Sequence, residues 1–392
     1  MEASPGIEPG LTDLQSAASP LRHEAGAGSL AEDLDCHKPL VNDGSGTAPD
    51  MRLAGLKRKQ TGQFNLMFAN RAAILAAALI CDRLLGDPDW LWSRLPHPTV
   101  LFGRVIAALD RLLNREDRSD SERRLAGVLS VAFILILAIA AGLVLAGLVR
   151  SLPGHPAVGF LAEAILASIF LAHRSLIDHV GAVAMALRSG GLSAGREAVA
   201  RIVGRDVSDL DEPGVARAAI ESLAENFSDG VLAPAFWYLV AGLPGLIAYK
   251  AVNTADSMIG YRTPRHQAFG WAAARLDDLM NWLPARLAAG FIIAAATFAG
   301  NGRRAIAVTI DDAAKHASPN AGCPEAASAG ALGLALGGPR RYGEQDVDGV
   351  WLNAEGSRTA DIASIEQATA LINRAWLGLL AVSLILALVF WR

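Results

Sequence analysis

Carboxylate side chains recur at four-residue spacing in the middle of the sequence, at Glu221, Glu225 and Asp229. If this stretch is helical, the three carboxylates project from one face. Such a row of like charges needs a positive partner, yet no Lys or Arg occupies a matching i+4 position on that face. Carboxylate oxygens, together with the amide oxygen of Asn226, suit a divalent ion such as magnesium that also bridges to phosphate. The spacing therefore predicts a magnesium site, with a solvated helix face as the alternative.

Two further polar stripes follow at helical spacing. The first, on an apolar helix expected to end at Gly260, consists of Lys250, Asn253, Asp256 and Ser257. The second consists of Arg275, Asp278, Asn281 and Arg286. Arginine offers a planar fork that matches carboxylate or phosphate, so the second stripe predicts an anion contact. Helix capping is the alternative explanation for Asp277 and Asn281.

Loops beside the apolar segments hold the remaining candidates. Asp82, Asp87 and His97 lie in a segment whose glycine and prolines break any helix, and a structural hydrogen bond is the alternative role for His97. A second polar region contains Lys315, His316, Ser318, Asn320 and Glu325, and further on Arg340 and Arg341. Turn amides beside basic side chains predict an anion cradle there. No GxxxxGK[ST] or GxGxxG motif occurs, so no motif indicates nucleotide binding.

These polar stretches alternate with apolar segments of near-membrane length. The 392 residues are 52% hydrophobic and 19% charged, which is typical of a multi-pass membrane protein. The apolar segments cover residues 66–81, 125–149, 156–172, 230–252, 285–300 and 375–391. Because about 20 helical residues cross a bilayer, we expect an all-α, multi-pass integral membrane fold with about four to six spans and helical polar connections.

The distribution of arginines predicts an orientation. The connection from 82 to 124 carries Arg83, Arg94, Arg104, Arg111, Arg115, Arg118, Arg123 and Arg124. The positive-inside tendency places this connection, and the 173–229 connection, in the cytoplasm. Strict alternation would then put 253–284 outside, away from the acidic stripe. A re-entrant 230–252 segment would bring both regions to one side, and its Gly and Pro residues make a broken segment as plausible as a straight one.

The first 66 residues differ in composition from the rest. They are rich in Gly, Pro, Ser, Ala and acidic residues, so we expect a disordered extension over 1–66 and a membrane domain over 67–392. Met67, with Met51 as the alternative, is the expected working start. The widely spaced Cys36, Cys81 and Cys323 indicate neither a disulfide framework nor a zinc site. With a net charge of -4 and no basic run, nothing indicates a nucleic-acid partner.

Six ordered blocks resemble those of one family. They read LLGDPDW, RIVGRD, ESLAENFSDGVLAPAFW, AVNTADSMIGY, FGWAAARLDDLMNWLPARL and KHASPNAGCPEAASAGALGLALGG. From about Met67 onward the chain resembles the CobD/CbiB family of cobalamin biosynthesis, the membrane-bound adenosylcobinamide-phosphate synthase. Ala317 and Cys323 stand where the family usually has Pro and Trp.

The resemblance implies an amide-forming enzyme. It would join the propionate carboxylate of cobyric acid to aminopropanol or its phosphate. The reaction would consume ATP and use magnesium. Glu221, Glu225 and Asp229 would then handle magnesium and phosphate. Catalytic roles would fall to Asp256, Asp278 and Lys315. Substrate contacts would come from Asp87, His97, Arg205, Asn226, Lys250, Asn253, Ser257, Arg275, Asn281, His316, Ser318, Asn320 and Glu325.

Two other function classes compete with this interpretation. A transporter uses broken apolar segments and intramembrane charges, but the sequence has no visible inverted repeat. A membrane alcohol phosphotransferase would use acidic stripes, but its DGxxAR pattern is missing.

A site at the surface of the cell membrane could receive an amphipathic corrinoid from another enzyme of the pathway.

Overall fold

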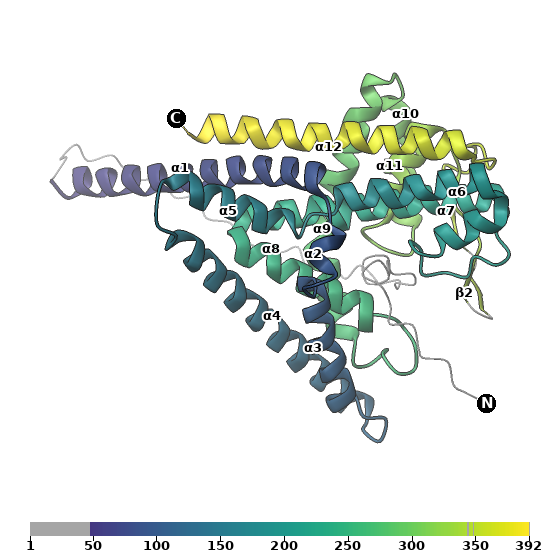
Figure 1. Ribbon diagram of the computed structural model, residues 1–392, viewed down its shortest axis with the longest axis horizontal. Coiled ribbons are helices and arrows are strands. Elements are labelled where there is room, and N and C mark those ends of the chain that lie inside the picture. The colour runs from purple at the N-terminus through teal and green to yellow at the C-terminus, as the bar shows by residue number, and fades with distance from the viewer. Residues whose placement is uncertain (1–47, 343–344, 348, 392) are drawn as a thin grey trace, which may run out of the picture.

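The computed structural model describes residues 48–342, 345–347 and 349–391, and these are mostly helical (Figure 1). The first helices are α1 (Ala48–Leu85), α2 (Asp89–Trp92), α3 (Pro98–Leu113), α4 (Asp120–Arg150), α5 (Pro156–Ser168) and α6 (His173–Val199). Next come α7 (Glu212–Phe227), the π-helical turn η1 (Ser228–Leu232), α8 (Ala233–Ile259), α9 (Trp271–Phe298) and α10 (Gly302–Asp312). The chain closes with η2 (Ala313–Lys315), α11 (Gly322–Leu332) and α12 (Ile362–Phe390).

Six helical segments of the described chain are long and apolar enough to cross a membrane. They are Gly62–Leu85, Asp120–Arg150, Pro156–Val199, Glu212–Ile259, Trp271–Phe298 and Ile362–Phe390. The expected all-α, multi-pass membrane fold is therefore confirmed.

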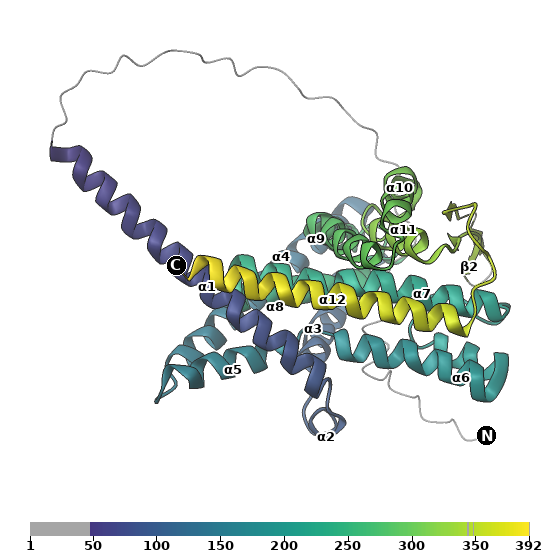
Figure 2. The ribbon, with the colours of Figure 1, turned by 90° about the horizontal axis from the view of Figure 1, so that it is seen from above.

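Helices α1 and α12 lie side by side in opposite directions (Figures 1 and 2). Where α1 ends, the Asp82 carboxylate accepts a hydrogen bond of 3.1 Å from the backbone N–H of His173, the first residue of α6. The His173 ring stacks on Trp376 of α12 at a centroid distance of 5.0 Å. These contacts join α1, α6 and α12 near the C-terminal end of α1.

The expected extension over 1–66 and the structure differ in where the first helix begins, because α1 starts at Ala48. Between Pro49 and Met67 the sequence contains Leu, Lys, Arg and Gln and no further proline, so helix propensity carries the apolar helix toward the N-terminus. The rest of the predicted extension, residues 1–47, lies outside the described residues.

Helix α8 reverses direction at Gly242 and forms a hairpin: its first arm precedes Gly242, its second arm follows it, its tip lies at Gly242, and its open end is opposite the tip. Gly242 has φ 67° and ψ −153°, a conformation that glycine adopts without a steric penalty, and Pro244 prevents a continuous helix. A side chain at Gly245 would collide with the backbone oxygen of Trp237. The chain therefore folds back, and of the alternatives for 230–252 the structure has the broken one.

The hairpin tip is held by polar groups from α1 and α5. The Arg71 guanidinium donates to the backbone oxygen of Val240 at 2.7 Å, where the first arm ends with unpaired carbonyls. The Tyr238 hydroxyl donates to Glu163 at 2.9 Å. Arg71 and Glu163, two of the charges inside the apolar segments, thus contact the hairpin.

Short strands connect α11 to α12. Strand β1 (Leu336–Gly337) pairs antiparallel with β4 (Trp351–Leu352). Strand β2 (Arg340–Tyr342) pairs antiparallel with β3 (Gln345–Val347). The first pair places Gly337 against α7, beside the acidic stripe.

Candidate functional site

A buried lysine marks the centre of the candidate site. Lys250, on the second arm of the α8 hairpin, is 6% exposed. The carboxylates of Asp229, Asp87 and Asp277 interact electrostatically with its ammonium group. They come from η1, from the loop before α2 and from α9. The loop before α2 and three successive elements, η1, α8 and α9, thus bring one cation and three anions together.

A chain of hydrogen bonds runs beside Lys250. The Tyr249 hydroxyl lies 2.9 Å from both the backbone oxygen of Asp229 and the side-chain oxygen of Asn281. The Asn281 amide donates to Asp277 at 3.0 Å, and Asn253 donates to the same carboxylate at 3.3 Å. These bonds orient the Asp277 carboxylate. We call the set Asp87, Asp229, Tyr249, Lys250, Asn253, Asp277 and Asn281 the central polar cluster.

His97 borders this cluster, and its hydrogen bonds are those of a helix cap. It is the N-cap of α3, and its Nδ1 accepts from the backbone N–H of Thr99 at 3.3 Å. Its Nε2 lies 3.3 Å from the backbone oxygen of Ile169, which can only accept, so Nε2 carries the proton. Burial, reinforced by the positive charge of Lys250, lowers the pKa of His97 to about 4. The His97 imidazole is therefore neutral and hydrogen-bonded at both nitrogens. Its Nε2 lies 3.9 Å from the Asp87 carboxylate.

The acidic stripe is divided between different partners. Glu221 forms an ion pair of 3.0 Å with Arg205 and accepts a hydrogen bond of 2.7 Å from the backbone N–H of Gly337. Asp229, in contrast, belongs to the central polar cluster. Within the described residues, no three or more His, Cys, Asp or Glu side chains are grouped to hold a metal ion. Glu221 and Asp229 therefore have different partners in the structure, and the magnesium triad stays a prediction.

The Arg205 ion pair fixes the loop between α6 and α7. The Arg205 and Glu221 side chains are 9% and 6% exposed. At the residue directly after Glu221, the Ser222 hydroxyl donates to the backbone oxygen of Ile202 at 2.7 Å. Asn226, half-buried, donates to the backbone oxygen of Ser222 at 2.9 Å. These contacts give Arg205, Glu221 and Asn226 structural partners.

The loop before α11 meets α9 next to the cluster. Asn320 donates to the backbone oxygen of Asp278 at 2.9 Å, and Asp278 directly follows Asp277. The Ser318 hydroxyl accepts from the backbone N–H groups of Asn320 and Ala321, at 3.3 and 3.1 Å. His316 lies 3.6 Å from the buried Glu325. The two predicted polar regions therefore adjoin each other through α9.

Known proteins match most of this chain. A family model described as "CobD/Cbib protein" matches residues 75–372. The chain belongs to the CobD/CbiB family. The cobalamin biosynthesis protein CobD of Sinorhizobium fredii is 53% identical over 321 residues, 81% of this chain and 97% of that protein. Proteins of the same name from Rhizobium meliloti and Rhodobacter capsulatus are 53% and 49% identical, each over 79% of this chain, and cover 94% and 95% of those proteins. No solved structure matches it.

Several predicted residues of this CobD/CbiB chain lie away from the central polar cluster. Lys315, with a side chain 53% exposed, pairs with Asp312 at 2.6 Å. Asp312 also accepts from the backbone N–H of Asn353, so this pair belongs to the junction of η2 and β4. Arg275 is exposed on α9, whereas Asp277 faces inward. The side chains of Arg340 and Arg341 lie outside the described part.

The other predicted residues lie at or near the hairpin's open end. Asp256 is 7% exposed and interacts electrostatically with Tyr249. Glu225 and Ser257 are half-buried, on α7 and α8. Glu225 and Ser257 are therefore partly accessible polar side chains, whereas Asp256 is buried.

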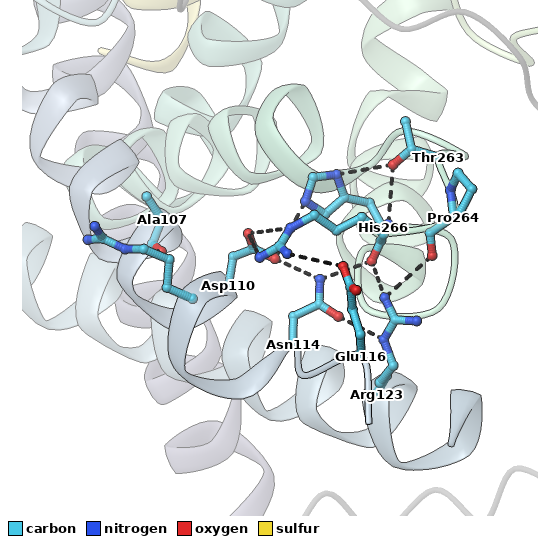
Figure 3. Close-up of polar contacts among 10 residues, drawn as sticks. Ala107, Asp110, Asn114, Glu116, Arg123, Thr263, Pro264 and His266 are labelled. Carbon is cyan, nitrogen blue, oxygen red and sulfur yellow. Dashed lines mark hydrogen bonds and ion pairs between the residues drawn. The ribbon is translucent and has the colours of Figure 1, made fainter. Parts of the chain in front are cut away.

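A polar network missed by the sequence analysis fixes the α8–α9 connection (Figure 3). Asp110 accepts from Asn114 at 2.7 Å and from Arg265 at 2.9 Å, and Arg123 donates to Asn114 at 2.9 Å. Burial opposes ionisation, but the Asn114 and Arg265 hydrogen bonds hold the pKa of Asp110 below its usual value. His266 joins at 3.4 Å from Asp110.

Most residues of that network and of the central polar cluster had no recognisable local signal. Arg123 is 7% exposed, although its place among loop arginines suggested a topological role. In the central polar cluster, Tyr249 was not part of the predicted stripe although Asn253 lies four residues after it, and Asp277 resembled a helix cap. The one usable signal was the i+4 spacing of Asp277 and Asn281, which are hydrogen-bonded in the structure.

Proposed function

We propose that this CobD/CbiB chain catalyses ATP-dependent amide formation between the propionate carboxylate of cobyric acid and aminopropanol or its phosphate. The observation that supports the proposal most is the central polar cluster, in which three aspartates interact with the buried Lys250. A carboxylate donor and an amine acceptor need such paired charges. The relatives' name, cobalamin biosynthesis protein, agrees with this reaction class.

The reaction divides into two balanced steps. The substrate carboxylate attacks the terminal phosphate of ATP, giving an acyl phosphate and ADP. The amine then attacks the acyl carbon, so a C–N bond forms, the C–O bond to phosphate breaks and phosphate leaves. The amine must lose protons, and a positioned carboxylate can accept them.

Residue roles follow from charge. Lys250 stabilises the negative oxygens of the carboxylate or acyl phosphate. Asp229, Asp87 and Asp277 attract the ammonium form of the acceptor, and one of them, or Asp256 or Asp278, takes its proton. Arg275 and Lys315 remain proposed phosphate contacts at the periphery. Magnesium is proposed as the companion of ATP, without ligands assigned in this chain.

The cluster is proposed to face the cytoplasm. Asp87 belongs both to the cluster and to the 82–124 connection with its eight arginines. The positive-inside tendency places that connection, and therefore the cluster, where ATP is available.

Transport is the less favoured function. Intramembrane charges that line a transport path need exposure to it. Arg71 and Glu163 instead contact the hairpin through Val240 and Tyr238. Both charges therefore have a structural explanation.

Purified full-length protein in detergent tests the proposal. It is incubated with cobyric acid, magnesium, ATP and either aminopropanol or its phosphate, and corrinoids are followed by mass spectrometry. The expected product has the mass of both substrates minus water, and its formation falls by about 10²-fold or more in Lys250→Met. Arg188→Gln, at a surface ion pair with Glu366, is the matched control.

Two outcomes would contradict the proposal. One is an absence of product with both amines, when the protein is folded. The other is corrinoid uptake into vesicles that hold the same protein, without ATP-dependent product.

A further inference from the structure

We propose that α9 lies along the surface of the bilayer and does not cross it. Its length and hydropathy would allow a crossing. A straight helix of 28 residues is about 42 Å long, enough to pass through a bilayer. The contacts at its two ends point instead to a helix that begins and ends on one side.

The first end of α9 lies at the open end of the α8 hairpin. The loop before α9 is tied to α3 and α4 by the polar network of Figure 3. A side chain at Gly127, near the start of α4, would collide with the backbone oxygen of Phe269. The hairpin tip contacts α4 much further along, where a side chain at Gly142 would collide with Pro244. These positions are 15 residues apart, or about 22 Å along α4.

The second end returns to the same side. After α9, α10 turns back and packs on α11, where Gly330 meets the backbone of Ala305. The strand that follows α11 places Gly337 against Glu221 of α7. Glu221 lies on the far side of Asp229 from the hairpin tip, because α7 precedes η1. A membrane crossing would have delivered α10 to the tip side.

The figures agree with this placement. In Figure 1, α1, α7 and α12 run along the long axis, whereas the chain of α9 runs across them toward α10. Figure 2, turned by 90°, shows the coils of α9 foreshortened beside α12. A helix at a large angle to the membrane-crossing helices lies roughly parallel to the bilayer plane.

The two faces of α9 suit an interface between protein and lipid. Asp277 and Asn281 belong to its buried face, which carries part of the central polar cluster. The opposite face exposes Trp271, Leu279, Trp282, Leu283, Leu287 and Phe298. Trp and long apolar side chains on one face are typical of helices embedded at the level of the lipid headgroups.

Basic side chains on the exposed side complete the pattern. Arg275 is exposed between the apolar positions, and the Arg286 guanidinium lies 4.3 Å over the Trp282 ring. Arginine beside tryptophan suits contact with lipid phosphates at the membrane surface. The occupant of this face is therefore a phospholipid bilayer, and the central polar cluster lies directly behind the interfacial helix.

Sidedness of labelling tests the proposal in full-length protein. Cys36, Cys81 and Cys323 are replaced by Ser, and single cysteines are introduced at Asn301, Arg118 and Leu152. The last two mark the α3–α4 connection and the α4–α5 turn. In sealed vesicles an impermeant maleimide should label Asn301→Cys from the same side as Arg118→Cys. Labelling from the Leu152→Cys side would overturn the proposal.

Depth measurements add an independent test. Nitroxides at Leu279, Leu283 and Leu287 should report one shallow depth by oxygen and nickel-chelate accessibility in phospholipid vesicles. Nitroxides at Leu129, Ile136 and Leu143 of α4 should report changing depth over about 21 Å. A graded depth along α9 would indicate a crossing helix, and full water accessibility would indicate a helix away from lipid. Either result would overturn the proposal.

Discussion

The hydroxyl of Tyr249 lies 2.9 Å from the backbone oxygen of Asp229, although the two residues are 20 positions apart in one helical run. A straight α-helix would separate them by about 30 Å. The reversal at Gly242 therefore creates the candidate site, because it returns the second arm of α8 to the level of η1. Every polar contact between these two arms depends on this reversal.

Replacing Tyr249 with Phe should weaken the site more than the fold. The variant loses the hydroxyl that contacts Asp229 and Asn281, so Asn281 and Asp277 lose part of their orientation. We expect product formation to fall by about 10-fold and unfolding free energy by roughly 1 kcal/mol. Tyr238→Phe, which loses the hydroxyl contact with Glu163 at the hairpin tip, is the matched control. Equal activity losses in both variants would contradict a specific role for Tyr249.

Glu221→Gln should act mainly on stability. The variant leaves Arg205 buried beside a neutral amide, and breaking a buried ion pair typically costs about 3–5 kcal/mol. We expect a lower Tm and an unchanged magnesium dependence of product formation. Glu225→Gln is the comparison, since Glu225 is half-buried and has a predicted role in magnesium handling. A raised magnesium requirement in Glu221→Gln, without loss of Tm, would restore Glu221 as a metal ligand.

Because of His97, we expect the folded chain to lose stability in mild acid. Its pKa in the folded chain is about 4, below the ordinary value of 6.5, so the unfolded chain binds the proton more tightly. The stabilising contribution is complete above pH 6.5 and is lost as the pH falls toward 4. Thermal unfolding between pH 7 and about 4.5 should show a falling Tm for the native chain and a flatter profile for His97→Gln. Parallel profiles would show that another group controls this pH range.

Gly242→Ala should strain the hairpin. An alanine at φ 67° costs roughly 1–2 kcal/mol, and the hairpin tip cannot relax while Arg71 holds its carbonyls. We expect a lower Tm and reduced product formation, because the second arm carries Lys250. Gly147→Ala on α4 is the control, since a side chain there meets no neighbouring atom. A Gly242→Ala variant as stable as the control would contradict the strained reversal.

Several properties could be predicted from the sequence because they depend on local composition and spacing. Apolar segments of membrane length predicted the all-α, multi-pass fold, and ordered motif blocks indicated the family. Glycine and prolines in 230–252 allowed a broken segment. Helical spacing also placed Lys250 and Asn253 together and assigned Asn281 to a polar stripe.

Only the tertiary structure decided which of these side chains meet. Helical periodicity says which residues share a face, but it does not say which faces pack together. Glu221 and Asp229 looked like one metal-binding row, yet one pairs with Arg205 and the other interacts with Lys250. Asp277 looked like a cap and belongs to the cluster, whereas Lys315 pairs with Asp312. The deciding event is the reversal at one glycine, which no spacing rule locates because it is fixed by packing against Arg71 and α4.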